Sequence, residues 1–540
     1  MLKSWKSLLR LGLVRALLVS ALVGLVFGVA CSSSDISQED LDAAKNLAVA
    51  QSELNSVKAD LSSATSELST AKSQVSDLQS QVTSMGQVPP AITVIQTGAS
   101  VPAAVGSAPT GWANAESERG GLYLIAQYDS SGPDAWSAAD HPLVYFTSDG
   151  TESSSPTYDK DAAYFAGFDM VDGYTKEVIE SVIFTELEGM AVASFPHGVG
   201  VSPDGKWVYV GFGMGDASEG YVAIVNARTL KIDKLIKQES YFEGGMRSQR
   251  LHHIQGWVDS TGKDKVILQW GFGANGGPHH ILDPNDDNRV SKSITYDDIK
   301  PMGHPFTTPS PNGQYIYVSM TSNWIRDNHS PAAAVAKFDI ETGKHVVIEG
   351  VGHHPIGITH TADGRWTYVV DGHSGHVYKI DNEIDEVVAD TNSGVAGPYG
   401  IALNWDETRA FIVAKGEGTH NLGGVLGVVD LTSFRAARDL HTYPLWLGGS
   451  ASSVDHAVLH PDPAINELWV SNMNGWETIV VDIATYTATD WIPTAAGGNT
   501  HAGAFVTYTS SWVGQLESDM GGPKSAEMWA NVEAKVAAAQ

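Results

Sequence analysis

Short apolar runs, each closed by a polar or glycine-containing turn, fill the sequence from about residue 120 to residue 509. Three examples are LYLIAQYD (122–129), WVYVGFG (207–213) and YIYVSM (315–320). Their length, their β-branched and aromatic content and their Gly, Asp or Asn boundaries are typical of β-strands. Almost no helical period interrupts them. This part of the chain therefore predicts an all-β domain.

The strands belong to a unit that recurs about every 50 residues. Each unit opens with His or Pro, continues through a Gly-containing apolar run and a turn like Ser-Pro-Asp-Gly, and ends in a strand rich in Trp, Tyr and Val. Copies of the motif are FPHGVGVSPDGKWVYVGF (195–212), HPFTTPSPNGQYIYVSM (304–320), GHHPIGITHTADGRWTYVVDGH (352–373) and PYGIALNWDETRAFIVA (398–414). Such units are typical of four-stranded propeller blades, so residues 119–510 predict a seven-bladed β-propeller. The seven blade-start positions are His197, His253, His304, His354, Tyr399, His456 and His501.

A heptad pattern precedes the propeller, over residues 36–85. The first apolar positions of successive heptads are Leu47, Leu54, Leu61, Leu68, Val75 and Val82. The pattern predicts an α-helical coiled-coil stalk that makes the protein a homo-oligomer, with a lone solvated helix or a disordered spacer as the alternatives. The Pro-, Ala- and Gly-rich residues 86–118 predict a linker, and residues 511–540 predict a tail with a short helix from Ser525.

The charge of the chain excludes one class of function. The formal net charge is −29, whereas nucleic-acid recognition requires clustered Lys and Arg side chains. We therefore expect no nucleic-acid partner. An acidic surface instead favours basic partners, such as some cytochromes.

The N-terminus has the composition of an export signal. Basic residues precede an apolar run, from Ala16 to Ala30, that ends at Cys31, the one cysteine in the sequence. This arrangement resembles the lipobox of bacterial lipoproteins, and the resemblance implies a signal peptide and anchor over residues 1–31 with lipid attached to Cys31. A plain signal peptide and an N-terminal membrane anchor are the alternatives. We expect an exported, membrane-anchored protein without disulfides.

Histidine is the residue type that recurs at the blade starts. Because the innermost strand of each blade starts near the central channel, these positions converge on one axis. Imidazole suits copper, zinc and iron, and a ring of imidazoles without thiolates favours copper. The alternative for each histidine is a role in packing or hydrogen bonding. The predicted metal ligands are His197, His252, His253, His304, His354, His456 and His501.

Two family resemblances extend this hypothesis. The blades resemble the YVTN/lactonase-like propeller superfamily, as in PHGVGVSPDGKWVYV and HPIGITHTADGRWTYVVD. Seven histidines on a seven-bladed propeller, including the adjacent pair His252–His253, are similar to the catalytic domain of nitrous oxide reductase. That resemblance implies a tetranuclear copper–sulfide centre of the CuZ type and the reaction N2O + 2 H⁺ + 2 e⁻ → N2 + H2O.

The resemblance also implies a partner. The family's C-terminal cupredoxin domain has no counterpart in this sequence, which implies a propeller-only form. Electrons would then come from an external donor, a small cytochrome or a cupredoxin. Lys415 and Glu417, in AKGEGTH, are candidate catalytic residues that handle the proton and the oxygen atom, or else solvated loop residues.

Three other functions are compatible with the pattern. One is a lactonase-like hydrolase that uses histidine as a general base. Another is a lipid-anchored YVTN-like propeller that acts as a binding or scaffold module. The third is a haem propeller resembling cytochrome d1, although no CxxCH motif is present to attach a c-type haem. The roles of His279, His280 and His360 stay open.

Overall fold

The computed structural model describes a propeller and the segments that join it. The described residues are 91–97, 122–138, 141–149, 165–194, 198–214, 219–238, 251–270, 279–294, 306–320, 333–416, 423–436, 445–448, 453–495, 497–501 and 503–539. The predicted signal peptide with Cys31 and the predicted stalk over 36–85 lie outside these residues. No helix in the described part of the chain is long and apolar enough to span a membrane.

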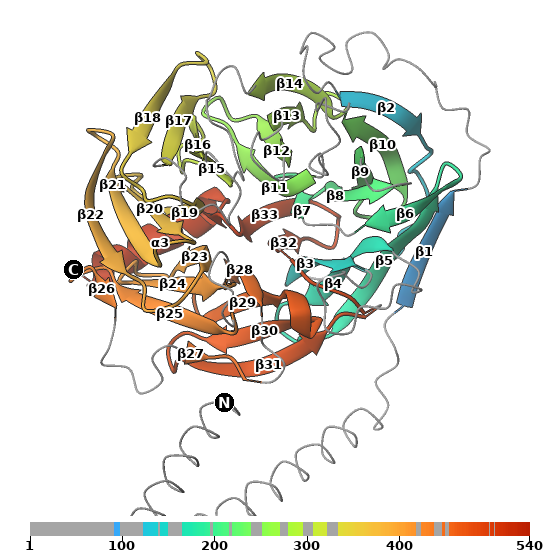
Figure 1. Cartoon of the computed structure of the whole chain (residues 1–540). Coiled ribbons are helices and arrows are strands. Elements are labelled where there is room, and N and C mark those ends of the chain that lie inside the picture. Colours follow the sequence, from blue (N-terminus) through green and yellow to red (C-terminus); the bar gives the residue numbers. More distant parts are fainter. Residues whose placement is uncertain are drawn as a thin grey trace, which may run out of the picture. The chain divides into compact units, whose positions relative to one another are not determined.

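Five blades are separate antiparallel sheets whose strands follow one another in chain order, four of them four-stranded and one five-stranded (Figure 1). The first two are β11 (Leu251–Val258), β12 (Asp264–Trp270), β13 (His279–Asp283) and β14 (Arg289–Ile294), then β15 (Thr307–Pro309), β16 (Tyr315–Met320), β17 (Ala334–Asp339) and β18 (His345–Glu349). The third is β19 (Pro355–His360), β20 (Trp366–Asp371), β21 (His376–Asp381) and β22 (Glu386–Asn392). The fourth is β23 (Pro398–Leu403), β24 (Arg409–Ala414) and β25 (Val425–Asp430), with β26 (Arg435–Ala436) and β27 (Leu445–Trp446) both on β25. The fifth is β28 (Val454–Leu459), β29 (Glu467–Asn472), β30 (Glu477–Asp482) and β31 (Thr487–Pro493), with a 3-10 turn, η1, at Met473–Gly475.

Two further blades complete the ring of seven in the described residues. One consists of β7 (Val199–Val201), β8 (Trp207–Met214), β9 (Glu219–Asn226) and β10 (Ile232–Gln238), with β2 (Leu122–Gln127) on its outer edge. The other joins the C-terminal β32 (Ala504–Tyr508) to β3 (Pro142–Asp149), β4 (Ala166–Asp172) and β5 (Val178–Leu187). The chain therefore closes its ring by pairing strands from both ends, while β6 (Met190–Ser194) bridges β5 and β8.

The structure differs from the predicted boundaries at both ends of the propeller. The segment 86–118, expected to be a linker, contains β1 (Ala91–Thr97), which pairs parallel with β5. The segment 511–540, expected to be a helical tail, begins with β33 (Gly514–Asp519) and β34 (Gly522–Pro523) before α3 (Ala526–Ala539). β1 finds its partner on a blade that is distant in the sequence, whereas β33 and β34 continue the antiparallel order from the neighbouring strand β32.

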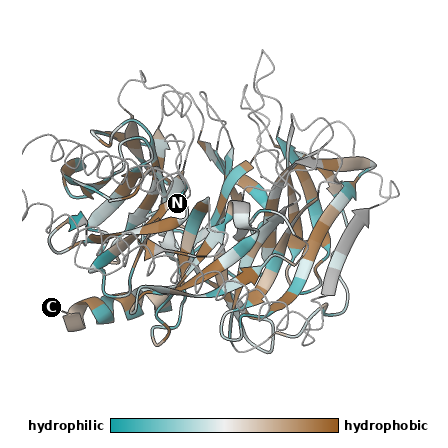
Figure 2. Cartoon of the chain, turned by 60° about the horizontal axis from the view of Figure 1, so that its bottom comes forward, coloured by the Kyte–Doolittle hydropathy of each residue, from teal (hydrophilic) through white to brown (hydrophobic). Residues whose placement is uncertain are grey.

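The blades pack through apolar side chains on facing sheets. Ile267 and Ile281 of one blade, for example, belong to the same buried cluster as Ile316 and Val318 of the next. Complete burial of such a side chain contributes roughly 1.5–3 kcal/mol. Hydrophobic residues accordingly run along the strands, and hydrophilic residues are frequent in the turns (Figure 2).

The repeated turn has a defined geometry. Its Gly takes a φ of +69°, +68° and +68° at Gly205, Gly313 and Gly364, in the left-handed region that side chains disfavour. A Ser or Thr hydroxyl at the start of the turn accepts the backbone N–H five residues later, as from Trp207 to Ser202 at 2.9 Å. The turn motif is therefore blade architecture.

Candidate metal centre

β-Bulges near the start of the inner strands determine which way the histidine side chains of the site face. The pairing register shifts between Leu251 and His253 in β11, and between Val454 and Ala457 in β28. A β-bulge sets two residues against one on the partner strand, so that consecutive side chains can face one side. The imidazole rings of His252 and His253 consequently lie with their centroids 3.8 Å apart.

Glycines in the preceding blade let these bulged strands come close. A Cβ atom on Gly400 would lie 2.8 Å from the carbonyl oxygen of Asp455 and 3.1 Å from the Cα atom of His456. A Cβ atom on Gly198 would likewise lie 3.0 Å from the backbone of His252. The Gly of the blade-start motif is thus required by the close approach of neighbouring inner strands.

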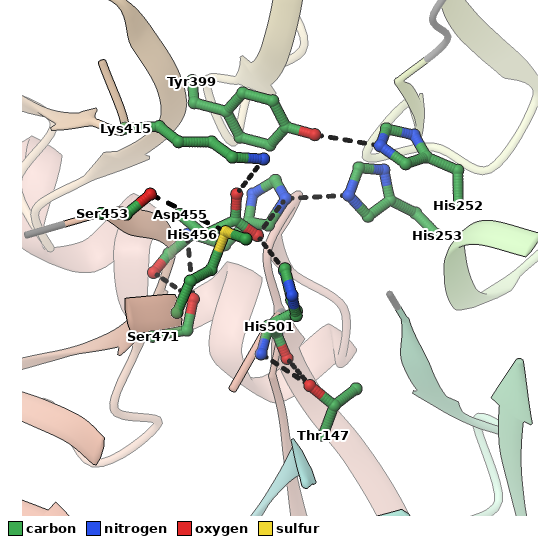
Figure 3. Close-up of polar contacts among 11 residues, drawn as sticks. Thr147, His252, His253, Tyr399, Lys415, Ser453, Asp455, His456, Ser471 and His501 are labelled. Atoms are coloured by element: carbon green, nitrogen blue, oxygen red, sulfur yellow. Dashed lines mark hydrogen bonds and ion pairs between the residues drawn. The ribbon is translucent and has the colours of Figure 1, made fainter. Parts of the chain in front are cut away.

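Histidines from three blades meet at the axis through one carboxylate (Figure 3). The Nε2 atoms of His253 and His456 are 2.9 Å apart. Asp455 Oδ2 lies 3.0 Å from Nδ1 of His501 and 3.6 Å from Nε2 of His456. Lys415, directly after β24, places its Nζ atom 3.0 Å from Asp455 Oδ1. Asp455 and the three histidines are at most 1% exposed.

A tyrosine occupies the blade start that lacks a histidine. The hydroxyl group of Tyr399 is 2.9 Å from Nε2 of His252. Its ring faces the Nζ atom of Lys415, at 3.8 Å from the ring centroid. Tyr399 therefore connects the histidine pair to the Lys415–Asp455 ion pair, and all of these groups belong to one polar network (Figure 3).

Backbone contacts fix two of the histidines. The N–H of His501 donates to Thr147 Oγ1 on β3 at 2.6 Å. The N–H of His456 donates to Ser471 Oγ on β29 at 3.0 Å. These hydroxyls fix the backbone of both residues, and Asp455 fixes the ring of His501.

The electrostatics favour an ionised Asp455 carboxylate beside a neutral His456 ring. Burial by itself would raise the pKa of Asp455, but Lys415, His456 and His501 together hold it well below its usual value. Burial lowers the pKa of His456 to about 4, with Asp455 opposing and Lys415 adding to the shift. His456 is therefore a neutral imidazole at neutral pH, the form that binds metals.

His354 lies at the start of β19 and is 4% exposed. Its N–H donates to Asp371 Oδ1 at 2.7 Å. Burial lowers its pKa to about 4, against the opposing charge of Asp371 and with smaller contributions from His373 and Lys415. His354 is thus a further neutral ring within the electrostatic range of Lys415.

The structure accounts for part of the predicted site. His252, His253, His456 and His501 come together with Lys415. His197, His304 and Glu417 lie outside the described residues. Among those described, no three His, Cys, Asp or Glu side chains are placed to hold a single metal ion.

Several other histidines lie away from the axial network. His279 and His280 are on β13, the third strand of their blade, where His280 Nδ1 is 2.8 Å from Ser293 Oγ. His360 closes β19 and has its Nδ1 atom 2.8 Å from Thr367 Oγ1. The adjacent pair at 279–280 is therefore no counterpart of the pair at 252–253.

The donor set fits copper in its chemistry. Neutral imidazoles, without thiolates, are ligands that copper accepts. Asp455 Oδ2 lies 3.0 Å from Nδ1 of His501, so that Nε2 is the ring nitrogen left for a metal, as in metal-binding histidines oriented by a carboxylate. His456 Nδ1 is buried and has no hydrogen-bond partner among the described residues.

Some members of this network carry weak sequence signals. In the sequence, Tyr399 differs from its neighbours only in being the one blade-start residue that is not a histidine. Asp455 differs only in being a carboxylate among the blade-start residues. Thr147 contacts His501 across the pairing of β3 with β32, two strands far apart in the sequence, and Ser471 is one of several hydroxyl residues on its strand. No sequence pattern predicts the bulges either.

Comparisons with known proteins leave the family open. No protein-family model and no curated protein matches the chain. It is similar to solved structures of the dihydro-heme d1 dehydrogenase NirN in complex with DHE (14% identity, 71% of this chain and 79% of that one, TM-score 0.43) and of the Kuenenia stuttgartiensis hydrazine synthase (17%, 64% and 99%, 0.40). A functionally unknown protein from Desulfotomaculum acetoxidans DSM 771 is 13% identical over 67% of this chain and 98% of that one, with a TM-score of 0.41. Similarities at this level carry no argument about function.

Proposed function

We propose that this chain is a copper-dependent oxidoreductase that reduces nitrous oxide to dinitrogen at the axis of its propeller. One observation carries the proposal: imidazoles from three blades meet in a buried network, with His253 Nε2 2.9 Å from His456 Nε2 and His501 held by Asp455. Such convergence is not needed to fold a propeller, because Tyr399 occupies an equivalent blade start without an imidazole.

The proposed ligands are the histidines at the blade starts. They are His197, His252, His253, His304, His354, His456 and His501. When bound, a reduced copper–sulfide centre would pass on the two electrons that the kinetically inert substrate requires. The imidazoles hold such ions without adding negative charge.

The protein's own part is to fix the rings. The bulges in β11 and β28 hold adjacent side chains toward the axis, and Asp455 orients His501 through Nδ1. Hydrogen bonds of this kind to metal-binding histidines typically contribute 10–100-fold in affinity or activity. Asp455 is therefore a positioning residue.

Burial restricts the substrate to a small molecule. His252, His253, His456 and His501 are at most 1% exposed. A three-atom substrate such as N2O requires little space beside them, whereas a lactone ring requires far more. The low-dielectric surroundings also strengthen the effect of every nearby charge.

Lys415 is the proposed source of positive charge beside the reacting oxygen. Its ammonium group sits between Asp455 and the face of Tyr399. A cation at this place stabilises negative charge that develops on oxygen and can donate a proton to it. Glu417 is the second proposed proton-handling residue.

The remaining parts of the proposal concern location and electron supply. Cys31 would carry the lipid anchor of an exported protein, and residues 36–85 would form its oligomeric stalk. Electrons would come from an external small cytochrome or cupredoxin. The net charge of −29 would favour a basic donor.

The test begins with composition. The full chain is loaded with copper under anaerobic conditions, and copper, acid-labile sulfide and haem are measured per chain. We expect several copper ions with sulfide, no haem, and consumption of N2O driven by reduced methyl viologen. A protein that retains no copper and consumes no N2O contradicts the proposal.

A pair of variants makes the test specific. His456→Ala should lose copper and activity while keeping the β-sheet circular dichroism of the wild type. His280→Ala is the matched control, since His280 is a buried histidine with a partner, Ser293, in its own blade. It should keep copper and activity.

The Asp455–His501 contact also supports a second candidate, hydrolysis with His501 as general base. A lactone or ester would have to reach an imidazole that is 0% exposed. Hydrolysis of lactones by the metal-free protein, abolished in His501→Ala, would favour this candidate over the reductase.

A further inference from the structure

A second group of buried polar side chains lies where β11 and β15 meet the C-terminal segment of the chain. We call it the lower polar cluster, and it comes from β11, β15, β19 and the C-terminal segment of β33 and β34. Lys524 Nζ is 3.2 Å from Asp519 Oδ1 and 3.3 Å from Gln255 Oε1. The side chains of Lys524 and Asp519 are 5% and 4% exposed. The members used below are Gln255, Thr308, His360, Asp519 and Lys524.

Gly521 lies among these groups. A Cβ atom there would be 2.5 Å from Thr308 Oγ1, 2.8 Å from Gln255 Oε1 and 3.1 Å from Lys524 Nζ. Glycine at this position therefore leaves the polar atoms facing one another without a side chain between them. Figure 1 shows β33 crossing the centre of the ring, where these strands meet.

Several polar atoms of the lower polar cluster have no hydrogen-bond partner in the described part of the protein. They are Thr308 Oγ1, Asp519 Oδ2 and His360 Nε2. Buried polar atoms are nearly always paired, with protein or with ordered water. A group of such atoms is therefore a place where buried water is expected.

β11 joins the lower polar cluster to the metal centre. Residues two apart in a strand point to the same side, so that Gln255 and His253 face the same side of β11 in succession. Gln255 also donates to the carbonyl oxygen of Thr307 at 2.6 Å, which fixes its amide group. Polar groups thus continue from Asp519 through Lys524 and Gln255 toward His253.

We propose that the lower polar cluster is a hydrated path that delivers protons from Asp519, past Lys524 and Gln255, to the metal centre. The proposal rests on the proposed function: reduction of N2O consumes two protons for each two electrons and releases water, so a buried centre needs a route for protons. Burial raises the pKa of Asp519 against the opposing charge of Lys524, which increases its capacity to carry a proton.

A purely structural role for the ion pair is the competing explanation. Buried ion pairs are weak evidence for stability, because apolar side chains of similar volume often do as well or better. Apolar residues could therefore fill the space of the ion pair beside β33. The ion pair and the unpartnered atoms around it are better explained by transport.

The first measurement needs no variant. In a high-resolution crystal structure of the protein, ordered water should bond to Thr308 Oγ1, Asp519 Oδ2 or both. A dry cluster would overturn the path whether or not the protein reduces N2O.

The second measurement compares Asp519→Asn with the wild type. We expect equal copper content, a rate of N2O reduction at least about tenfold lower, since positioned proton transfer typically contributes 10²–10⁴-fold, and a larger solvent deuterium isotope effect. Asp169→Asn is the matched control: this carboxylate is also buried, but it lies on β4 and accepts the N–H of Ala495. Its isotope effect should equal that of the wild type.

The two proposals fail separately. A wild-type protein that holds copper but does not reduce N2O overturns the reductase. An active wild type with a hydrated cluster, whose Asp519→Asn variant keeps the wild-type rate and isotope effect, overturns the path and leaves the reductase standing.

Discussion

Two pairs of adjacent histidines lie on one blade, His252–His253 on β11 and His279–His280 on β13, and their surroundings differ. All four residues are 0% exposed. A bulge in β11 sets the first pair side by side, where it contacts Tyr399 and His456 of other blades. The second pair follows the regular register opposite Gln269 and Leu268. Consecutive residues in such a strand face opposite sides.

Two features therefore bring a histidine pair to the axis of this propeller. One is its strand, because the innermost strand places the pair against side chains of distant blades. The other is the bulge, because without it one ring of the pair would face a neighbouring blade. The two pairs are equally buried and have the same His-His sequence, so neither burial nor the dipeptide distinguishes them.

The largest expected effect comes from removing one imidazole ring from each pair in turn. His253→Ala should lose most of the bound copper and all N2O reduction, because its Nε2 atom faces His456 at the axis. His279→Ala should keep both, although its free energy of unfolding falls through the cavity it creates. Copper per folded chain is the measurement. Equal copper in the two variants would mean that the axial pair is structural.

The next largest effect concerns the charge beside the axial pair. Lys415→Met leaves Asp455 buried without its cation, and breaking a buried pair in this way costs about 3–5 kcal/mol. We expect urea unfolding of the metal-free protein to show a loss of this size. The double variant Lys415→Met/Asp455→Asn should recover part of it, since the uncompensated charge is gone. If the double variant recovers no stability, the loss comes from the packing of Lys415 against Tyr399 and not from the unpaired charge.

The sequence predicts much of the fold and less of the site. The Ser-Pro-Asp-Gly-like turns and the strand after each one repeat, so the blades can be counted from local patterns. Blade-start histidines follow from the same repeat. The partnership of Lys415 with Asp455 joins two blades, and the bulge at His252 depends on the pairing of β11 with β12. Local sequence encodes neither, and the same holds for the pairing of β1 with β5.

A smaller effect is expected from the glycine that admits the bulged strand. Gly400→Ala introduces a methyl group 2.8 Å from the carbonyl oxygen of Asp455, so β23 or β28 must shift. Overpacking of this kind typically costs about 1–3 kcal/mol. Copper affinity should fall as well, because the shifted strand carries His456. Calorimetry and copper titration of the variant measure the two effects, and unchanged copper affinity would show that the site tolerates the shift.

The smallest expected effect concerns the pair on β13 and the dependence of the free energy of unfolding on pH. Burial lowers the pKa of His279 to about 3, with a smaller contribution from His280. In the unfolded chain this imidazole therefore binds a proton near pH 6.5, whereas in the folded chain it binds one only near pH 3. The free energy of unfolding falls as the pH drops through this window. The contribution is at most about 1.4 kcal/mol per pH unit. His279→Leu should reduce the pH slope of the free energy of unfolding by up to this amount in the metal-free protein. Ile281→Val, which shortens a buried apolar side chain on the same strand and removes no titratable group, is the control that should leave the slope unchanged. Equal slopes in all three proteins would mean that water reaches the ring of His279, and burial alone would then no longer distinguish the pair on β13 from a surface one.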